Sequence, residues 1–172
     1  MQTFIFDAGP LITACKFEVD RQAVIDHLLA HCQIVVAESV RDEVVVAGAR
    51  YADAQIAKER IDNGKISVLA PEFLPDLTGL IAPYKLGQGE QDSLLLVNDS
   101  SLQNPILVVD DHLAFLVSTR LGQSCYFLLD AIVELTRMAN MDKDRALKLV
   151  TAIHARYPTA FVEHTRLLLL QR

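Results

Sequence analysis

The sequence predicts an α/β domain built around a parallel sheet. Short apolar runs rich in β-branched residues alternate with longer helix-patterned segments, which is the order of βαβ units. The chain has 172 residues, 51% of them hydrophobic, which is enough for one sizeable core. It contains no repeat, low-complexity tract or linker. We therefore expect a single domain over residues 1–172.

Five segments have the composition expected of strands. If the first strand has the second and third on one side and the fourth on the other, the strand order reverses between the first and the fourth. Ligands of open α/β sheets bind at such a point, beyond the carboxyl ends of the strands. The expected strands are residues 3–7, 33–37, 66–69, 106–110 and 125–128.

Capping and turn residues predict the helices of the first half. Pro10 lies near the start of a helix that follows the first strand, where a missing N–H is tolerated. Ser39 and Asp42 resemble a capping box, which would place Glu43 in about the first turn of a helix. A further helix is expected over 52–63, and it ends at a glycine in a left-handed cap.

The second half begins with an irregular stretch, residues 71–83, that contains several prolines. A helix is then expected from Glu90 to about Asn98, and another from Asp111 or His112 to Leu121-Gly122. The tail over 131–172 is expected to contain two or three helices, and Pro158 is expected to break it.

Acidic residues stand at the ends of expected strands and the starts of expected helices. A carboxylate beside buried strand ends is costly unless a positive group offsets its charge. Oxygen ligands of this kind suit Mg²⁺ or Mn²⁺, and suit zinc or copper poorly. Two such ions can activate water and hold the leaving oxygen of a phosphodiester. The acids are Asp7, Glu43, Glu90, Asp92, Asp110 and Asp111.

In two pairs of these acids, helix or strand geometry has to decide which member faces the site. Glu90 and Asp92 lie on different faces of a regular helix. Asp92 shares a face with two leucines, so we expect Asp92 to be the buried member and Glu90 a rim residue, second ligand or cap. Asp110 and Asp111 are consecutive and point in opposite directions if the strand continues, which leaves either one as the ligand.

Composition and charge exclude several classes of protein. A net charge of −6 argues against a broadly basic nucleic-acid binder, although it does not argue against a nuclease whose metal site is acidic. Cys15, Cys32 and Cys125 are scattered, so neither a disulfide framework nor a zinc site is expected. No apolar run has the length of a signal peptide or a membrane span. A soluble cytoplasmic protein is expected.

The acids belong to four longer segments. These are Phe6-Asp7-Ala8-Gly9-Pro10-Leu11-Ile12, Val40-Arg41-Asp42-Glu43-Val44, Leu86-Gly87-Gln88-Gly89-Glu90-Gln91-Asp92 and Val108-Val109-Asp110-Asp111-His112, the last ending in Arg120-Leu121-Gly122. In this order and spacing, the segments resemble the PIN-domain nucleases. The resemblance covers about residues 1–130, which leaves 131–172 as a C-terminal helical extension. It implies a three-layer α/β/α fold with a central parallel sheet of about five strands, and an acidic site for Mg²⁺ or Mn²⁺.

The resemblance implies an endoribonuclease that hydrolyses RNA phosphodiester bonds, as the VapC-like toxins of toxin–antitoxin pairs do. RNA is then the substrate, an antitoxin protein is a further partner, and a homodimer is expected. The implied catalytic residues are Asp7, Glu43, Asp92 and Asp111. The implied metal ligands are Asp7, Asp92 and Asp111, with Glu90 and Asp110 as further candidates.

Two positions depart from the family pattern and keep a second interpretation open. Gly9 stands where a small polar residue is usual, and Val109 stands where Thr or Ser is usual. Together with the acidic net charge, these departures favour the alternative of a catalytically degenerate PIN-like module for nucleic-acid binding or regulation. A response-regulator receiver, which residues 106–112 also resemble, is disfavoured because too few residues follow Asp110.

Overall fold

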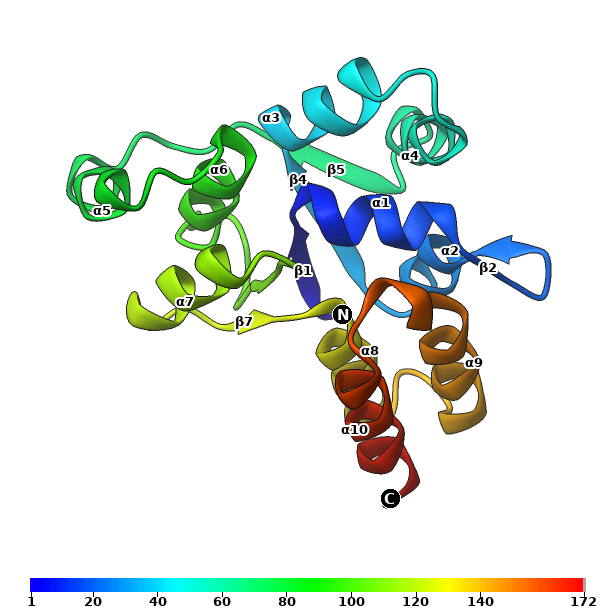
Figure 1. The fold of residues 1–172 in the computed structure, drawn as a ribbon. Coiled ribbons are helices and arrows are strands. Elements are labelled where there is room, and N and C mark those ends of the chain that lie inside the picture. Colours follow the sequence, from blue (N-terminus) through cyan, green and yellow to red (C-terminus); the bar gives the residue numbers. More distant parts are fainter. Residues whose placement is uncertain (172) are drawn as a thin grey trace.

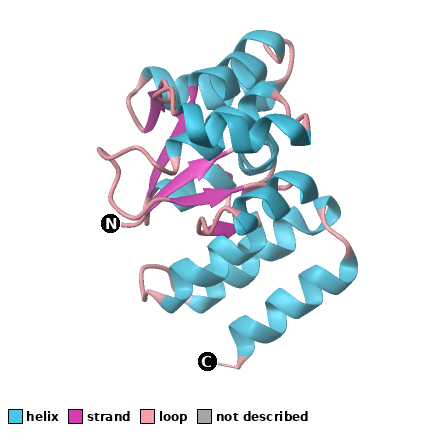
Figure 2. Ribbon diagram, turned by 90° about the vertical axis from the view of Figure 1, so that its left-hand side faces the viewer, coloured by secondary structure: helices cyan, strands magenta, loops and turns pink. Residues whose placement is uncertain are grey.

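A five-stranded, all-parallel sheet forms the centre of the protein, as Figure 1 shows for a computed structural model that describes residues 1–171. Helices cover both faces, so the predicted α/β/α architecture is confirmed (Figures 1 and 2). The strand order is β5-β4-β1-β6-β7. The strands are β1 (Thr3–Phe6), β4 (Gln33–Ala37), β5 (Ile66–Leu69), β6 (Ile106–Val108) and β7 (Cys125–Tyr126).

Strand β1 lies at the centre of the sheet, and Phe4, Ile5 and Phe6 present apolar side chains to both faces. All four of its residues are buried, and Phe4 is paired with Ile34 of β4 on one side and Ile106 of β6 on the other. The chain moves outward from β1 to β4 and β5 and then returns to β6. The predicted reversal therefore lies between β1 and β6, and residues that follow these two strands meet at one edge of the sheet.

Two helical layers flank the sheet. Helices α1 (Ala8–Lys16), α2 (Val24–Leu29) and α4 (Ala52–Asp62) cover one face, while α6 (Gln88–Leu96) and α7 (His112–Arg120) cover the other (Figure 1). Helix α5 (Pro75–Ile81) packs outside α6. Helix α3 (Glu38–Arg41) continues into a π-helical turn, η1 (Asp42–Ala47). Gly64 has φ +69°, which confirms the left-handed cap predicted after α4.

The C-terminal extension consists of three packed helices. These are α8 (Leu128–Arg137), α9 (Lys143–Ile153) and α10 (Thr159–Leu170), and the 3₁₀ turn η3 (His154–Arg156) follows α9. Pro158 precedes α10 and separates it from α9, as predicted. Helix α8 packs on β7, and it begins at Leu128 rather than after residue 130. Within residues 1–171, no helix combines the length and apolar character needed to cross a bilayer.

Three local expectations were wrong or incomplete. Ser39 does not cap a helix, because the chain passes from β4 directly into α3 at Glu38 and leaves the Ser39 hydroxyl buried without a hydrogen-bond partner among residues 1–171. The stretch 71–83 contains α5 and the 3₁₀ turn η2 (Ala82–Tyr84), and Pro75 occupies the first position of α5. A short hairpin, β2 (Glu18–Val19) with β3 (Gln22–Ala23), was not predicted.

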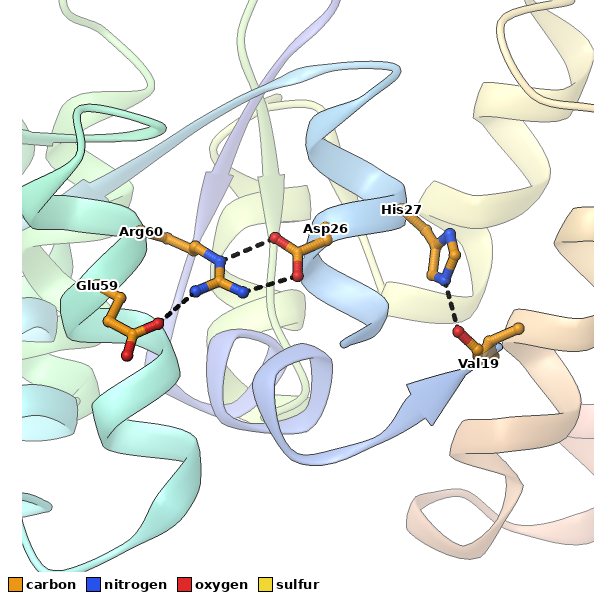
Figure 3. Close-up of polar contacts among 5 residues, drawn as sticks. All are labelled: Val19, Asp26, His27, Glu59 and Arg60. Atoms are coloured by element: carbon orange, nitrogen blue, oxygen red, sulfur yellow. Dashed lines mark hydrogen bonds and ion pairs between the residues drawn. The ribbon is translucent and has the colours of Figure 1, made fainter. Parts of the chain in front are cut away.

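An ion pair joins α4 to α2 on the face of the sheet opposite α6 and α7. The Arg60 guanidinium donates through Nε to Oδ1 and through Nη2 to Oδ2 of Asp26, each over 2.8 Å (Figure 3). Beside it, buried His27 has Nε2 at 3.0 Å from the carbonyl oxygen of Val19, which ties α2 to the hairpin. These contacts hold the α1 side of the sheet together.

Candidate metal centre

An open cleft of about 430 Å³ lies at the carboxyl edge of the sheet, where the strand order reverses. The turn after β1, the turn after β6, the π-helical turn η1 and the first turn of α6 supply its walls. Five carboxylates line the cleft, and among residues 1–171 its lining includes no Lys or Arg. The lining residues are Asp7, Ala8, Gly9, Glu43, Gly87, Gly89, Glu90, Asp110 and Asp111.

Asp7 lies at the base of the cleft. Its backbone N–H donates to the carbonyl oxygen of Val108 over 3.0 Å, so the pairing of β1 with β6 fixes its position. The residue is only 6% exposed. Burial raises the pKa of Asp7 to about 7, a backbone hydrogen bond from Ala8 lowers the pKa, and Glu90, Glu43 and Asp111 raise it further.

Glu43 reaches the same point from the π-helical turn. A Cβ atom added to Gly89 would lie 3.3 Å from Oε2 of Glu43 and 3.7 Å from Oδ1 of Asp7. The two carboxylates therefore converge on the backbone of α6 at Gly89. Only glycine allows this approach without moving a neighbour, because the same Cβ would also lie 3.2 Å from Cγ2 of Val40.

Glu90 has one of the roles expected for it, the cap of α6, whereas Asp92, expected as the buried member of the pair, is no more buried than Glu90. Glu90 lines the cleft, and its Oε2 accepts a hydrogen bond of 2.8 Å from the backbone N–H of Gly87, which caps α6. Burial raises the pKa of Glu90, a hydrogen bond from Gly87 lowers it, and Asp111 and Glu43 raise it again. Asp92 is half-buried and is absent from the cleft lining. It accepts a hydrogen bond of 2.7 Å from the side chain of Gln88.

Asp110 and Asp111 line the cleft but interact with different partners. Asp111 caps α7, with Oδ1 accepting a hydrogen bond of 2.8 Å from the backbone N–H of Ala114. Its charge raises the pKa of both Asp7 and Glu90. Asp110 instead accepts hydrogen bonds from the hydroxyl of Tyr157, in the C-terminal extension. Burial raises the pKa of Asp110, and the bond from Tyr157 lowers it.

Four carboxylates thus form one electrostatic group: Asp7, Glu43, Glu90 and Asp111. None of them belongs to an ion pair within the part of the chain that the structure describes. An all-oxygen set around a buried negative charge fits Mg²⁺ or Mn²⁺ in chemistry. In spacing the set is open: among residues 1–171, no three side chains of His, Cys, Asp or Glu are grouped closely enough to hold a metal ion.

Gly89, which lines the cleft, and Tyr157, which bonds to the cleft residue Asp110, were not predicted as residues of the site. Gly89 belongs to a Gly-x-Gly loop, but its closeness to Glu43 depends on how α3 packs against α6. Tyr157 is 47 residues from Asp110, and nothing local marks it as a partner. Both became visible only through long-range packing.

Comparisons with known proteins give no family. Neither the scan against models of protein families nor the search among proteins of curated function gives a match to this sequence. The case for a function therefore rests on the acids of the cleft and on the motifs that surround them.

Proposed function

We propose that the protein is a Mg²⁺- or Mn²⁺-dependent endoribonuclease of the PIN-domain type. The observation that carries this proposal is the state of Asp7, a carboxylate only 6% exposed whose nearest charges are also negative. Burying such a group is costly unless a cation offsets its charge. A divalent ion with oxygen ligands is the partner that suits four carboxylates on one cleft.

The four acids take different parts in this proposal. Asp7 is fixed by the strand ladder and is the central ligand, while Glu43 orients a ligand or the attacking water from the π-helical turn. Glu90 and Asp111 each use one oxygen to cap a helix, which leaves the other oxygen for a cation. The ions, when bound, supply Lewis-acid polarisation of the phosphate and lower the pKa of bound water. Asp92 has no part in it.

Cleavage of RNA by the purified full-length protein tests the proposal. With Mn²⁺, the protein should cut labelled RNA, and EDTA or Asp7→Asn should abolish the cutting. Asp92→Asn is the matched control for Asp7→Asn. It makes the same substitution and removes the same charge, but at a residue that does not line the cleft. An Asp7→Asn protein as active as wild type would contradict the assignment.

A second candidate is a PIN-like binding or regulatory module without catalysis. It is favoured by the fact that three of the acids already accept hydrogen bonds within the protein: Glu90 from Gly87, Asp111 from Ala114 and Asp110 from Tyr157. Calorimetry separates the two candidates. Absence of Mn²⁺ binding at millimolar concentration, together with retained RNA binding, supports the module.

We further propose a homodimer that forms through α10. Phe161, Leu167 and Leu170 are 51%, 55% and 56% exposed, which is unusual for large apolar side chains on one short helix. A two-fold pair is the commonest soluble assembly. Light scattering should give the mass of a dimer for the wild type, and Leu167→Glu should give a monomer. A monomeric wild type would contradict this part of the proposal.

A toxin role in the cytoplasm is the last part of the proposal. It is supported by the resemblance of the motifs to VapC-like toxins and by three free cysteines, of which Cys15 and Cys32 are buried. A small adjacent antitoxin gene and growth arrest on expression are the expected observations. Growth arrest should disappear with Asp7→Asn, and its persistence would separate toxicity from the cleft.

A further inference from the structure

The C-terminal extension reaches the cleft through one side chain. The Tyr157 hydroxyl lies 3.0 Å from Oδ1 and 2.9 Å from Oδ2 of Asp110, and the backbone N–H of Leu128 donates to the same carboxylate. Asp110 thus ties the end of β6 to the start of α8 and to the segment before α10. A hydroxyl between both oxygens occupies the position that a chelated cation would take.

The surroundings of Asp110 differ from those of the four carboxylates that form the electrostatic group of the cleft. Neighbouring carboxylates raise the pKa of Asp7 and that of Glu90. Hydrogen bonds from Tyr157 and Leu128 and the charge of Arg156 instead lower the pKa of Asp110, which burial raises. Asp111 acts on the other acids of the cleft and caps α7, whereas Asp110 faces the extension through Tyr157. The charge of Asp110 already has partners within the protein.

Arg156, next to Tyr157, places a cation close enough to the cleft residue Asp110 to lower the pKa of that carboxyl, although Arg156 and Tyr157 are not among the residues that line the cleft. It is exposed, and its Nε lies 3.3 Å from Oγ1 of Thr13 in α1. Thr13 is just over one helical turn, about 6 Å, along α1 from the cleft residue Gly9. Figure 1 shows the segment between α9 and α10 beside α1. Within residues 1–171, Arg156 belongs to no ion pair.

We propose that the Arg156–Tyr157 segment is the substrate-side wall of the cleft. Tyr157 is a positioning residue that holds the segment on Asp110, and Arg156 binds an RNA phosphate that neighbours the scissile one. The inference rests on the proposed ribonuclease function. A guanidinium suits phosphate oxygens in charge and geometry, and a protein of net charge −6 needs a local cation to hold a polyanion.

Steady-state cleavage of a labelled single-stranded RNA tests the role of Arg156. Arg156→Ala should raise KM about tenfold, with kcat and Mn²⁺ affinity unchanged, because only substrate binding is lost. Its KM should also depend less steeply on salt, by about one unit of logarithmic slope. Arg156→Lys should recover part of the loss, because it keeps the charge but not the planar fork of donors.

Arg137→Ala is the matched control. Arg137 lies in the same extension and pairs with Glu134 on α8 at 3.6 Å, so its loss removes the same charge away from the cleft. KM should stay at the wild-type value. Equal KM values for Arg156→Ala and wild type would overturn this inference and leave the proposed function intact. A wild type that neither cuts RNA nor binds Mn²⁺ would defeat the proposed function itself.

Tyr157→Phe tests the positioning role because it removes only the hydroxyl. The melting temperature should fall by about 3–6 °C, KM should rise toward that of Arg156→Ala, and Mn²⁺ affinity should not change. Asp110→Asn should reproduce this pattern. If Asp110→Asn loses Mn²⁺ binding as Asp7→Asn does, Asp110 is a ligand and the inference is wrong. If Tyr157→Phe lowers the melting temperature alone, the contact is structural and the positioning role is wrong.

Discussion

Gly89 and Glu43 approach each other so closely that a Cβ at position 89 would lie 3.3 Å from Oε2 of Glu43. We predict that Gly89→Ala displaces Glu43 and lowers Mn²⁺ affinity about tenfold, because small shifts of metal-site side chains are costly. The free energy of unfolding should change by less than about 1 kcal/mol, since the gain in helix propensity offsets the crowding. Calorimetry and urea unfolding measure the two effects.

Gly79→Ala is the control for this prediction. Gly79 lies in α5, and a Cβ there would have no atom within 4 Å. Removing the glycine should therefore stabilise the protein by about 0.5–1 kcal/mol and leave Mn²⁺ affinity unchanged. A Gly89→Ala protein that binds Mn²⁺ as tightly as Gly79→Ala does would show that Glu43 is not part of the metal site.

The pH dependence of the free energy of unfolding should report the raised pKa of Asp7 directly. Burial raises its pKa from the ordinary value of 3.8 to about 7. The folded state then holds a proton that the unfolded chain has released, so in EDTA the stability of the wild type falls as pH rises from about 4 to about 7. Asp7→Asn lacks this penalty. It should be more stable than wild type by about 2–4 kcal/mol at pH about 8, and the difference should shrink toward pH about 4.

Urea unfolding of both proteins across this pH range measures the difference. Mn²⁺ should reduce it at high pH, because an ion bound to the folded wild type stabilises that state by mass action. A wild type and an Asp7→Asn protein with parallel stability profiles would show that Asp7 titrates as an ordinary carboxyl.

Glu90 and Asp92 give a paired test of the ligand set. Glu90→Gln should lower Mn²⁺ affinity at least about tenfold, because it removes a charge that faces Asp7 across the cleft. Asp92→Asn should change the affinity by less than about twofold, since Asp92 pairs with Gln88 outside the cleft lining. Titration calorimetry compares them. The opposite order of effects would restore Asp92 as the ligand.

The Asp26–Arg60 pair should contribute to stability above acidic pH. Hydrogen bonds from Arg60 lower the pKa of Asp26, so its contribution is present above the unfolded value and is lost as pH falls through the lowered pKa. Asp26→Asn should cost about 1–2 kcal/mol near neutral pH and progressively less in acid. Lys58→Ala, which breaks the exposed pair with Asp62, should cost less than about 0.5 kcal/mol.

Much of the fold could be predicted because its signals are local. The apolar run of β1 and the glycine at position 64 each determine their own structure. The β2–β3 hairpin could not be predicted, because Asp20 and Arg21 take φ values of 51° and 67° without the glycine or asparagine that usually marks such a turn. Ser39 has the residue type of a cap, but the preceding strand leads into the helix one residue earlier.

The acidic residues of the site could be predicted from the sequence, but the directions in which their side chains point could not. The buried face of α6 runs through Gly89, Ser93 and Leu96, whereas the sequence interpretation placed Asp92 inward because it shares a helix face with two leucines. Glu90 lies on the side of this face that meets the cleft. The role of Tyr157 depends on the packing of the extension against β6, which no local pattern contains.

Anomalous diffraction from a crystal soaked in Mn²⁺ tests the central claim most directly. We predict a peak between Asp7, Glu43, Glu90 and Asp111, with ligand oxygens close to the ion and with Asp110 still bonded to Tyr157. A crystal with no peak in the cleft, or with a peak coordinated by Asp92, would contradict the account.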